Sequence, residues 1–212
     1  GWTVGELAQK IVAEQWITAS PSLSVISMEG WYASLWYDET NLPWVKPSPN
    51  MPDLGTALIY PGMCLLEGTN VSEGRGTDHP FQWFGAPWID GKILSQELNK
   101  LQLPGVVFVP KSFTPVSIAG VADKPKFENQ QCKGIEIRVI NRNEYQSIAV
   151  GVSVLKKLQE LYPENIVFKE NRLNRLWGSD TLLKELQKKQ RNIKFYAAGG
   201  LTIFLLITLL IN

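Results

Sequence analysis

The sequence predicts a single domain of the mixed α/β (α+β) class, in which one mixed sheet is flanked by helices. Its 212 residues are enough for one domain of ordinary size with a substantial core. Short apolar runs alternate along the chain with longer segments whose apolar residues recur at helical spacing. The sequence holds no internal repeat and no low-complexity tract, which excludes repeat architectures.

The chain begins with a predicted helix and continues into a predicted strand. Thr3 and Glu6 have the spacing of a capping box, and the residues that follow place their apolar side chains on one helical face. Residues 23–28 are a short apolar run bounded by Ser20-Pro21 and Gly30, which predicts a strand.

A proline-dense loop and a second strand come next. Each proline between residues 42 and 52 restricts itself and the residue before it, so the loop is expected to be stiff and to hold Asn50 in a defined place. Pro61-Gly62 is a turn signal, and the apolar run at 63–66 directly after it predicts a strand.

The remaining elements follow in the second half of the chain. Asp90 is a suitable N-cap for a helix over 89–101, and in the run 134–140 apolar residues alternate with charged ones, which predicts a strand with one wet face. The other predicted elements are a strand at 106–109, an extended piece at 113–118 and helices at 151–162 and 180–189. The strands at 23–28, 63–66, 106–109 and 134–140 are expected to share the sheet.

Composition and charge exclude several kinds of function. The chain has 21 basic and 20 acidic residues and a net charge of +1, so nothing indicates a nucleic-acid-binding surface. No Cys/His spacing indicates a metal site, and no motif indicates a cofactor. Cys64 and Cys132 leave a disulfide open, because their separation in space cannot be read from the sequence.

Residues 60–77 are a glycine-rich stretch, and the rest of the chain is expected to form the scaffold that positions it. Its polar residues between glycines can converge on one ligand, because glycine lets the backbone approach closely. Four aromatic residues follow within 80–88. Sugars are commonly held by polar groups at their edges and by an aromatic ring on their apolar face. The alternative is a solvated loop in which Arg75 pairs with a glutamate. The candidate residues are Glu67, Asn70, Glu73 and Arg75, with Asn50, Trp36 and Trp83 from other segments.

The C-terminal tail differs from the rest of the chain. Residues 195–211 carry no charge, and their number is at the lower limit of the ~17–25 needed to span a bilayer. A buried C-terminal helix is the alternative, although a soluble helix normally shows a polar stripe. Basic residues precede the tail, so a spanning tail would place the domain in the cytoplasm. The predicted boundaries are 1–190 for the domain and 195–211 for an apolar helix that packs outside the core.

Five motifs are shared, in order, with a known family. They are Pro47-Ser-Pro-Asn-Met-Pro52, Tyr60-Pro-Gly62, Leu66-Glu-Gly-Thr-Asn70, Ser72-Glu-Gly-Arg-Gly-Thr77 and Phe84-Gly-Ala-Pro-Trp88. From about Thr3 to about Leu186 the chain resembles the C-terminal half of the exo-β-N-acetylmuramidase (NamZ-type) family, formerly described as a domain of unknown function. The resemblance implies that an N-terminal Rossmann-like half, which carries an acidic catalytic residue, closes a cleft against this one. The apolar tail departs from the family.

The resemblance also implies a reaction, the hydrolysis of a terminal N-acetylmuramic acid at the non-reducing end of peptidoglycan fragments. Glycoside hydrolysis usually needs two carboxyl groups, for which Glu67 and Glu73 are the candidates. Partial burial at the end of a strand would raise the pKa of Glu67 toward the range that suits a general acid, whereas Glu73 beside Arg75 would stay ionised. Arg75 is suited to bind the lactyl carboxylate that separates muramic acid from other hexosamines. The alternative for each glutamate is a local role, in which Glu73 pairs with Arg75 and Glu67 caps loop amides.

Three interpretations follow. The first is the C-terminal half of a peptidoglycan glycosidase, which contributes binding residues to a cleft shared with a separate half. The second is a muramyl-sugar-binding module without its own chemistry, and the third is a membrane-tethered remnant of a split gene. The expected partners are peptidoglycan fragments or muramyl sugars, the N-terminal half and, through the tail, a membrane. The family implies the cell envelope or secretion and the tail implies membrane association, so the compartment stays open, as does activity of the chain alone.

Overall fold

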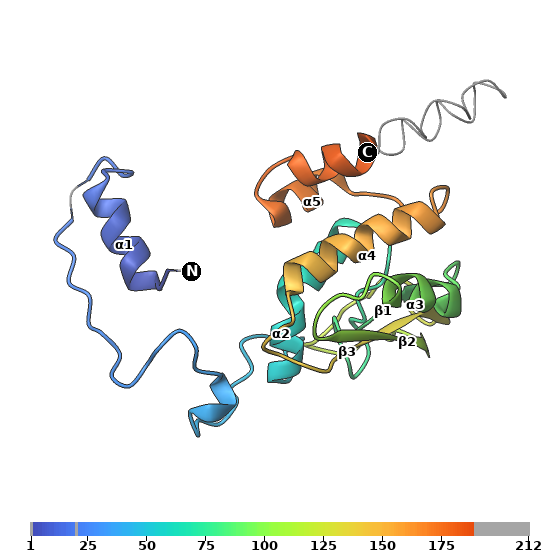
Figure 1. The fold of residues 1–212 in the computed structure, drawn as a ribbon, viewed down its shortest axis with the longest axis horizontal. Coiled ribbons are helices and arrows are strands. Elements are labelled where there is room, and N and C mark those ends of the chain that lie inside the picture. Colours follow the sequence, from blue (N-terminus) through green and yellow to red (C-terminus); the bar gives the residue numbers. More distant parts are fainter. Residues whose placement is uncertain (1, 20, 189–212) are drawn as a thin grey trace, which may run out of the picture. The chain divides into compact units, whose positions relative to one another are not determined.

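The computed structural model describes residues 2–19 and 21–188, and it confirms the mixed α/β class (Figure 1). By its internal contacts the chain divides into a first unit, Gly1–Pro43, and a second unit that begins at Trp44. The main cluster of buried hydrophobic residues lies entirely in the second unit, from Ile59 to Leu186. The two units are therefore described separately.

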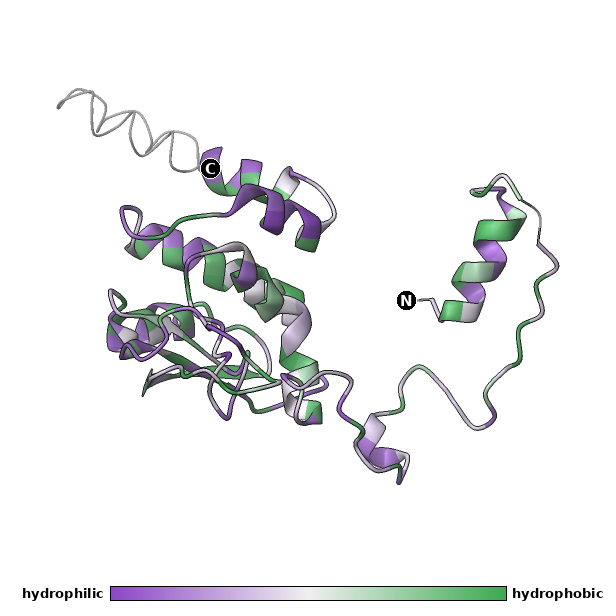
Figure 2. Ribbon diagram, turned by 180° about the vertical axis from the view of Figure 1, so that it is seen from behind, coloured by the Kyte–Doolittle hydropathy of each residue, from purple (hydrophilic) through white to green (hydrophobic). Residues whose placement is uncertain are grey.

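The first unit begins with helix α1 (Val4–Ala13), as predicted. Thr3 is the N-cap: its Oγ1 accepts a hydrogen bond from the Glu6 backbone N–H at 3.2 Å, and its own N–H donates to Glu6 Oε2 at 2.7 Å. These two bonds form the capping box that the sequence indicated. No residue of α1 is buried, although apolar residues recur along it (Figure 2). A single 3₁₀ turn, η1 (Tyr37–Glu39), lies further along this unit.

The strand predicted at 23–28 is not formed. These residues belong to no helix or strand, and Ile26 and Met28 are 95% and 76% exposed. A strand requires a neighbour with which to exchange ladder hydrogen bonds, and none of the described segments pairs with this one. The prediction is wrong at this segment because strand-like composition does not supply a pairing partner.

The second unit is built on a three-stranded antiparallel sheet. Its strand order is β1 (Trp83–Ala86), β3 (Cys132–Val139) and β2 (Val106–Phe113). The strands predicted at 106–109 and 134–140 are confirmed as parts of β2 and β3, and Ile135 and Ile137 of β3 are buried while Arg138 is exposed. β1 was not predicted. The sheet therefore has three strands rather than the four expected, and its pairing is antiparallel throughout.

The segment predicted as a turn and a strand at 60–66 is helical instead. Helix α2 (Leu54–Met63) begins at its N-cap Asp53 and tightens into the 3₁₀ helix η2 (Cys64–Gly68). Gly62 lies against helix α4 (Ser147–Leu161): its N–H donates to Ser147 Oγ at 2.8 Å, and a Cβ at position 62 would be 1.9 Å from Ser147 O. The glycine of the Pro-Gly pair thus permits close helix packing rather than a turn.

The predicted helices of the second half are present. Helix α3 (Gly91–Asn99) has Asp90 as its N-cap, as expected, and α4 covers the helix predicted at 151–162. Helix α5 (Glu170–Trp177), which was not predicted, ends at Gly178 with a φ of 84° and is followed by helical residues 181–188, where a helix was expected over 180–189. α3 and α4 contact each other, and α3 packs on β2 and β3.

Two further expectations concern the tail and the cysteines. The apolar segment 195–211 lies outside the described residues. Among residues 2–19 and 21–188, no helix is long and apolar enough to cross a bilayer. Cys64 and Cys132 are both free thiols.

Candidate functional site

The chain from η2 to β1 places the predicted polar residues around a tight, glycine-containing loop. Ser72 is paired with Gly85 through two backbone hydrogen bonds of 2.9 and 3.0 Å, which fix the loop to β1. Gly74 and Gly76 have φ values of 76° and 79°. A Cβ at Gly74 would be 2.4 Å from the carbonyl oxygen of Trp83. These glycines permit close approach, but the groups approached are backbone carbonyls of the same chain.

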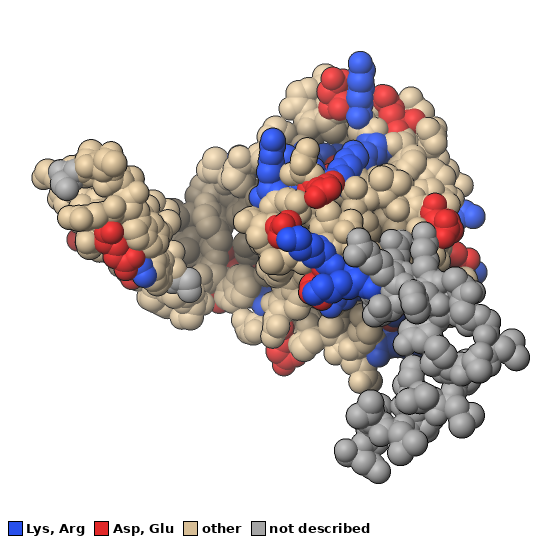
Figure 3. All heavy atoms as spheres, turned by 90° about the horizontal axis from the view of Figure 1, so that it is seen from above, with Lys and Arg blue, Asp and Glu red and all other residues tan. Residues whose placement is uncertain are grey.

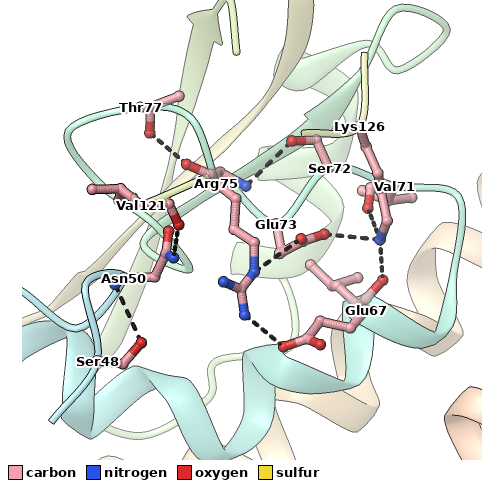
Figure 4. A network of polar contacts seen from close by, with 12 residues as sticks. Ser48, Asn50, Glu67, Val71, Ser72, Glu73, Arg75, Thr77, Val121 and Lys126 are labelled. Atoms are coloured by element: carbon pink, nitrogen blue, oxygen red, sulfur yellow. Dashed lines mark hydrogen bonds and ion pairs between the residues drawn. The ribbon is translucent and has the colours of Figure 1, made fainter. Parts of the chain in front are cut away.

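Arg75 joins the two candidate carboxylates (Figure 4). Its Nη2 is 3.3 Å from Glu67 Oε1, and its Nε is 3.4 Å from Glu73 Oε1. The side chains of Glu67 and Glu73 are 11% and 7% exposed, whereas that of Arg75 is 33% exposed. The pairing of Glu73 with Arg75 that the sequence left as an alternative is therefore present. Glu67 is also ion-paired with Arg75, whereas its expected alternative was to cap loop amides. Arg75 is the member of this group that solvent reaches most.

Lys126 completes the network on its buried side, and sequence reasoning missed it. Its Nζ donates to Glu73 Oε2 at 2.8 Å and to the carbonyl oxygens of Leu66 and Val71, each at 2.9 Å. Three acceptors match the three donors of an ammonium group. Burial lowers the pKa of Lys126, an effect that the charge of Glu73 partly offsets. Lys126 thus links Leu66, at the beginning of the loop, to Val71 and Glu73, further along it.

Arg172 of α5 is the second residue that sequence reasoning missed. Its Nη2 contacts Glu67 Oε2, and the hydrogen bond and the charge of Glu67 raise the pKa of Arg172. Both oxygens of Glu67 therefore contact guanidinium groups, one from the loop and one from α5. Glu67 lies in the 3₁₀ helix η2 rather than at the end of a strand, and its partly buried carboxylate is held in ion pairs.

The two asparagines are engaged within the chain. Asn50 is 4% exposed, and its Nδ2 donates to Val121 O at 2.6 Å, on the same side of the network as Arg75 in Figure 4. Asn70 donates through Nδ2 to Asn165 O at 2.8 Å and accepts from the Val167 N–H at 2.9 Å. Each asparagine fixes a loop that is distant in the sequence.

The two tryptophans occupy different surroundings. Trp83 in β1 has Lys111 Nζ 3.9 Å from its ring centroid and the ring of His79 4.3 Å away. Trp36 precedes η1 in the first unit, and the structure does not place that unit relative to Arg75. Phe81 is an aromatic neighbour of Arg75, with its ring centroid 5.1 Å from Arg75 Cζ, and the ring of Tyr60 is 4.8 Å from that of Phe81.

A hollow elsewhere on the second unit is separate from this network. A cavity of about 400 Å³ is lined by residues at the start of α3 and at the neighbouring ends of β2 and β3. None of the seven predicted site residues lines it. The lining residues are Asp90, Gly91, Lys92, Pro110, Lys111, Ser112 and Lys133. Elsewhere, acidic and basic side chains are interspersed on the face seen in Figure 3, and the described residues hold no cluster of three potential metal ligands.

Comparison with known proteins identifies the family. The sequence model described as exo-beta-N-acetylmuramidase NamZ, C-terminal, matches residues 58–204, which is more than half of the chain. The chain belongs to this family. The corresponding N-terminal model matches residues 1–55, so the NamZ match begins before the C-terminal portion.

Relatives of this NamZ-family chain include one curated protein and two solved structures. The peptidoglycan beta-N-acetylmuramidase NamZ of Bacillus subtilis (strain 168) is 42% identical over 79% of this chain and 38% of its own length. A DUF1343 family protein from Bacteroides fragilis has a TM-score of 0.75 and 28% identity over 85% of this chain and 47% of that chain. A second protein of that description has a TM-score of 0.60 and 27% identity, covering 89% and 48%. The chain thus spans less than half of each relative.

The fold brings together three of the seven predicted site residues directly, namely Glu67, Glu73 and Arg75. Asn50 lies beside them, Asn70 is tied to residues 165–167, and Trp83 and Trp36 have the separate surroundings described above. The missed residues Lys126 and Arg172 are 53 and 105 positions from their glutamate partners. No local pattern in the sequence marks either of them.

Proposed function

We propose that this chain supplies the muramic-acid-binding part of a peptidoglycan glycosidase. The family and the description of the Bacillus subtilis relative as a peptidoglycan beta-N-acetylmuramidase support a sugar substrate from peptidoglycan. The observation that carries the proposal is the position of Arg75. Its guanidinium is held by two carboxylates through Nε and Nη2, yet a third of the side chain, 33%, is exposed. The exposed part can donate to an incoming carboxylate.

The balance of charge around Arg75 supports an anionic ligand. The network contains three cations, Arg75, Lys126 and Arg172, and two carboxylates, Glu67 and Glu73, so three minus two leaves a net charge of +1. One additional carboxylate would neutralise the group. The lactyl carboxylate of N-acetylmuramic acid is the group that distinguishes this sugar from N-acetylglucosamine. By binding this carboxylate, Arg75 would favour N-acetylmuramic acid over N-acetylglucosamine.

The same network argues that the chain binds the sugar without cleaving it alone. Glycoside hydrolysis commonly uses one carboxyl group as a general acid and a second as a base or nucleophile. Here Glu67 contacts two guanidinium groups and Glu73 contacts a guanidinium and an ammonium group. Both oxygens of Glu67 and both oxygens of Glu73 are thus engaged by cations of the same chain, an arrangement that suits these carboxylates to positioning Arg75. We infer that the acid comes from the N-terminal part of the full-length relatives, of which this chain spans 38% in the Bacillus subtilis case.

A muramyl-sugar-binding module without chemistry of its own is the second candidate. The ion pairing of both glutamates favours it, because that pairing already engages both carboxylates with cations of the same chain. The two candidates differ in whether a second protein part restores turnover. A third interpretation, a membrane-tethered remnant, depends on residues 195–211, which lie outside the described residues.

Release of a chromophore from an aryl N-acetylmuramide tests the proposal. We expect no measurable turnover by the chain alone, and partial turnover when the N-terminal part of the Bacillus subtilis relative is added in trans. Glu67→Gln should then reduce the restored turnover, and the control Glu136→Gln, which alters a glutamate paired with Arg138 outside the network, should not. Robust turnover by the chain alone, abolished by Glu67→Gln, would make Glu67 the catalyst and contradict the two-part account. Sugar binding without restored turnover would favour the binding module.

A further inference from the structure

Tyr60 and Arg75 both contact the ring of Phe81. Tyr60 lies in the last turn of α2, and its half-buried ring meets that of Phe81 edge to face, with centroids 4.8 Å apart and planes at 87°. Arg75 Cζ is 5.1 Å from the centroid of the same Phe81 ring. Tyr60 and Arg75 therefore share one aromatic support, and each keeps a part of its side chain open to solvent.

The support itself is held firmly. Phe81 is 1% exposed, its N–H donates to Glu73 O at 2.6 Å, and its φ of 64° places it in the left-handed region that a phenylalanine rarely adopts. Non-glycine residues persist in that region only where the surrounding structure determines them, and such residues cluster at functional sites. Phe81 is thus a buried, firmly held neighbour of both Tyr60 and Arg75.

The hydroxyl of Tyr60 is a free donor in this arrangement. Burial raises the pKa of Tyr60, as do the nearby Cys64 and Glu67, while Arg75 and Arg172 act in the opposite direction. The phenol therefore stays protonated at neutral pH and can donate a hydrogen bond. Within residues 2–19 and 21–188, this hydroxyl has no hydrogen-bond partner. By contrast, the hydroxyl of Tyr162 accepts from the Asp90 N–H at 3.0 Å and donates to Asp90 O at 3.2 Å.

Neither predicted tryptophan offers the same combination. The ring of Trp83 is already occupied by Lys111 at 3.9 Å and His79 at 4.3 Å, and Trp36 belongs to the first unit. A pyranose needs an aromatic surface for its apolar face and polar groups at its edge. Tyr60 provides a ring and a donor within one residue, and it contacts the same Phe81 ring as the guanidinium proposed to bind the carboxylate.

We propose that Tyr60 contacts the bound sugar, with its ring against the apolar face and its hydroxyl donating to a ligand oxygen while Arg75 binds the lactyl carboxylate. This inference rests on the proposed function and adds to it the aromatic contact of the site. Loss of a neutral hydrogen bond weakens binding by roughly twofold to tenfold. Loss of the ring as well should weaken it further.

The test measures the dissociation constant of N-acetylmuramic acid by NMR titration, together with the melting temperature, for Tyr60→Phe and Tyr60→Leu. Tyr60→Phe removes only the free hydroxyl, so binding should weaken by roughly twofold to tenfold while the melting temperature is unchanged. Tyr60→Leu should bind more weakly still. The matched control is Tyr162→Phe, which removes a hydroxyl bonded within the fold and should lower the melting temperature without changing the dissociation constant.

Three outcomes would overturn the inference, and they differ in what else they overturn. Unchanged binding by Tyr60→Phe and Tyr60→Leu, with binding lost in Arg75→Ala, would remove Tyr60 from the site and leave the proposed function standing. Absence of binding by the unaltered chain would overturn the proposed function and this inference together. A fall in the melting temperature of Tyr60→Phe with no change in binding would show that the hydroxyl acts within the fold.

Discussion

Arg75, Glu73 and Lys126 show how single residues determine the shape of the candidate site. Arg75 reaches both glutamates, and Lys126 anchors Glu73 from the buried side with a 2.8 Å contact. Buried charges are stable only when they are paired and hydrogen-bonded, so each of these residues depends on the others. Among these three residues the side chain most exposed to solvent is that of Arg75, which leaves part of its guanidinium available to a ligand.

Lys126→Met should lower the free energy of unfolding. The substitution removes three hydrogen bonds and leaves Glu73, whose side chain is 7% exposed, with Arg75 as its ion-pair partner. An unpaired buried polar group costs roughly 1–3 kcal/mol, and urea denaturation would measure the change. In the control Lys100→Met, the affected side chain is 70% exposed and paired with Glu97, so a change within about 0.5 kcal/mol is expected. Equal changes in the free energy of unfolding for the two substitutions would show that the hydrogen bonds of Lys126 do not stabilise the fold.

Cys132 should titrate outside the range of an ordinary thiol. Burial raises its pKa from 9.0 to about 11, and its side chain is fully buried. Because the pKa is raised in the folded state, the protonated Cys132 thiol contributes fully to the free energy of unfolding below about pH 9. This contribution is lost as the pH rises through about 11. Cys132→Ala removes the titrating thiol. The difference in the free energy of unfolding between the unaltered chain and this variant should therefore become smaller as the pH rises from about 9 to about 11. A constant difference would show that Cys132 does not titrate there.

At the scale of elements, helix α2 illustrates what the sequence could and could not predict. The motif Tyr60-Pro-Gly62 has the composition of a turn, and the apolar run after it has that of a strand. The long-range contact with α4 decides otherwise, because Gly62 meets Ser147 backbone and side-chain atoms 85 positions away. Elements with local signals, such as α1 with its capping box and α3 with its N-cap Asp90, were predicted correctly.

The contact between α2 and α4 should be sensitive to one methyl group. Gly62→Ala would place a Cβ 1.9 Å from Ser147 O, which forces the helices apart. Overpacking of this kind typically costs about 1–3 kcal/mol, and thermal unfolding would report it. Gly55→Ala, in the same helix, places its Cβ 3.3 Å from the Asp53 side chain and should be neutral or slightly stabilising. Comparable destabilisation by both would mean that helix α2 does not pack as described.

At the scale of the whole molecule, the two units should differ in their contribution to stability. The main hydrophobic core contains residues from Ile59 to Leu186 and none from the first unit. Deletion of residues 1–43 should therefore leave a single cooperative unfolding transition with a similar melting temperature. Circular dichroism during heating would show this. Loss of the transition in the shortened chain would mean that the first unit is required for the fold.

The mixed α/β class and the family were predictable because the periodic segments and the motifs are local features of the sequence. The candidate site was predictable only in part. Glu67, Glu73 and Arg75 lie within one loop, and the fold joins them. Lys126, Arg172 and the ring of Tyr60 reach the same place from other elements. Contacts across 53 and 105 positions depend on the tertiary fold, which a motif does not specify.

The central claim is that Arg75 distinguishes N-acetylmuramic acid from N-acetylglucosamine, and the most direct measurement is the affinity of Arg75→Ala for both sugars by NMR titration. A charge-assisted hydrogen bond contributes roughly 1.5–3 kcal/mol, so the substitution should weaken binding of the acid by about tenfold to a hundredfold and leave that of N-acetylglucosamine nearly unchanged. The control Arg138→Ala, which alters an exposed arginine paired with Glu136, should affect neither. Equal losses for the two sugars would contradict the claim and show that Arg75 holds the loop rather than the ligand.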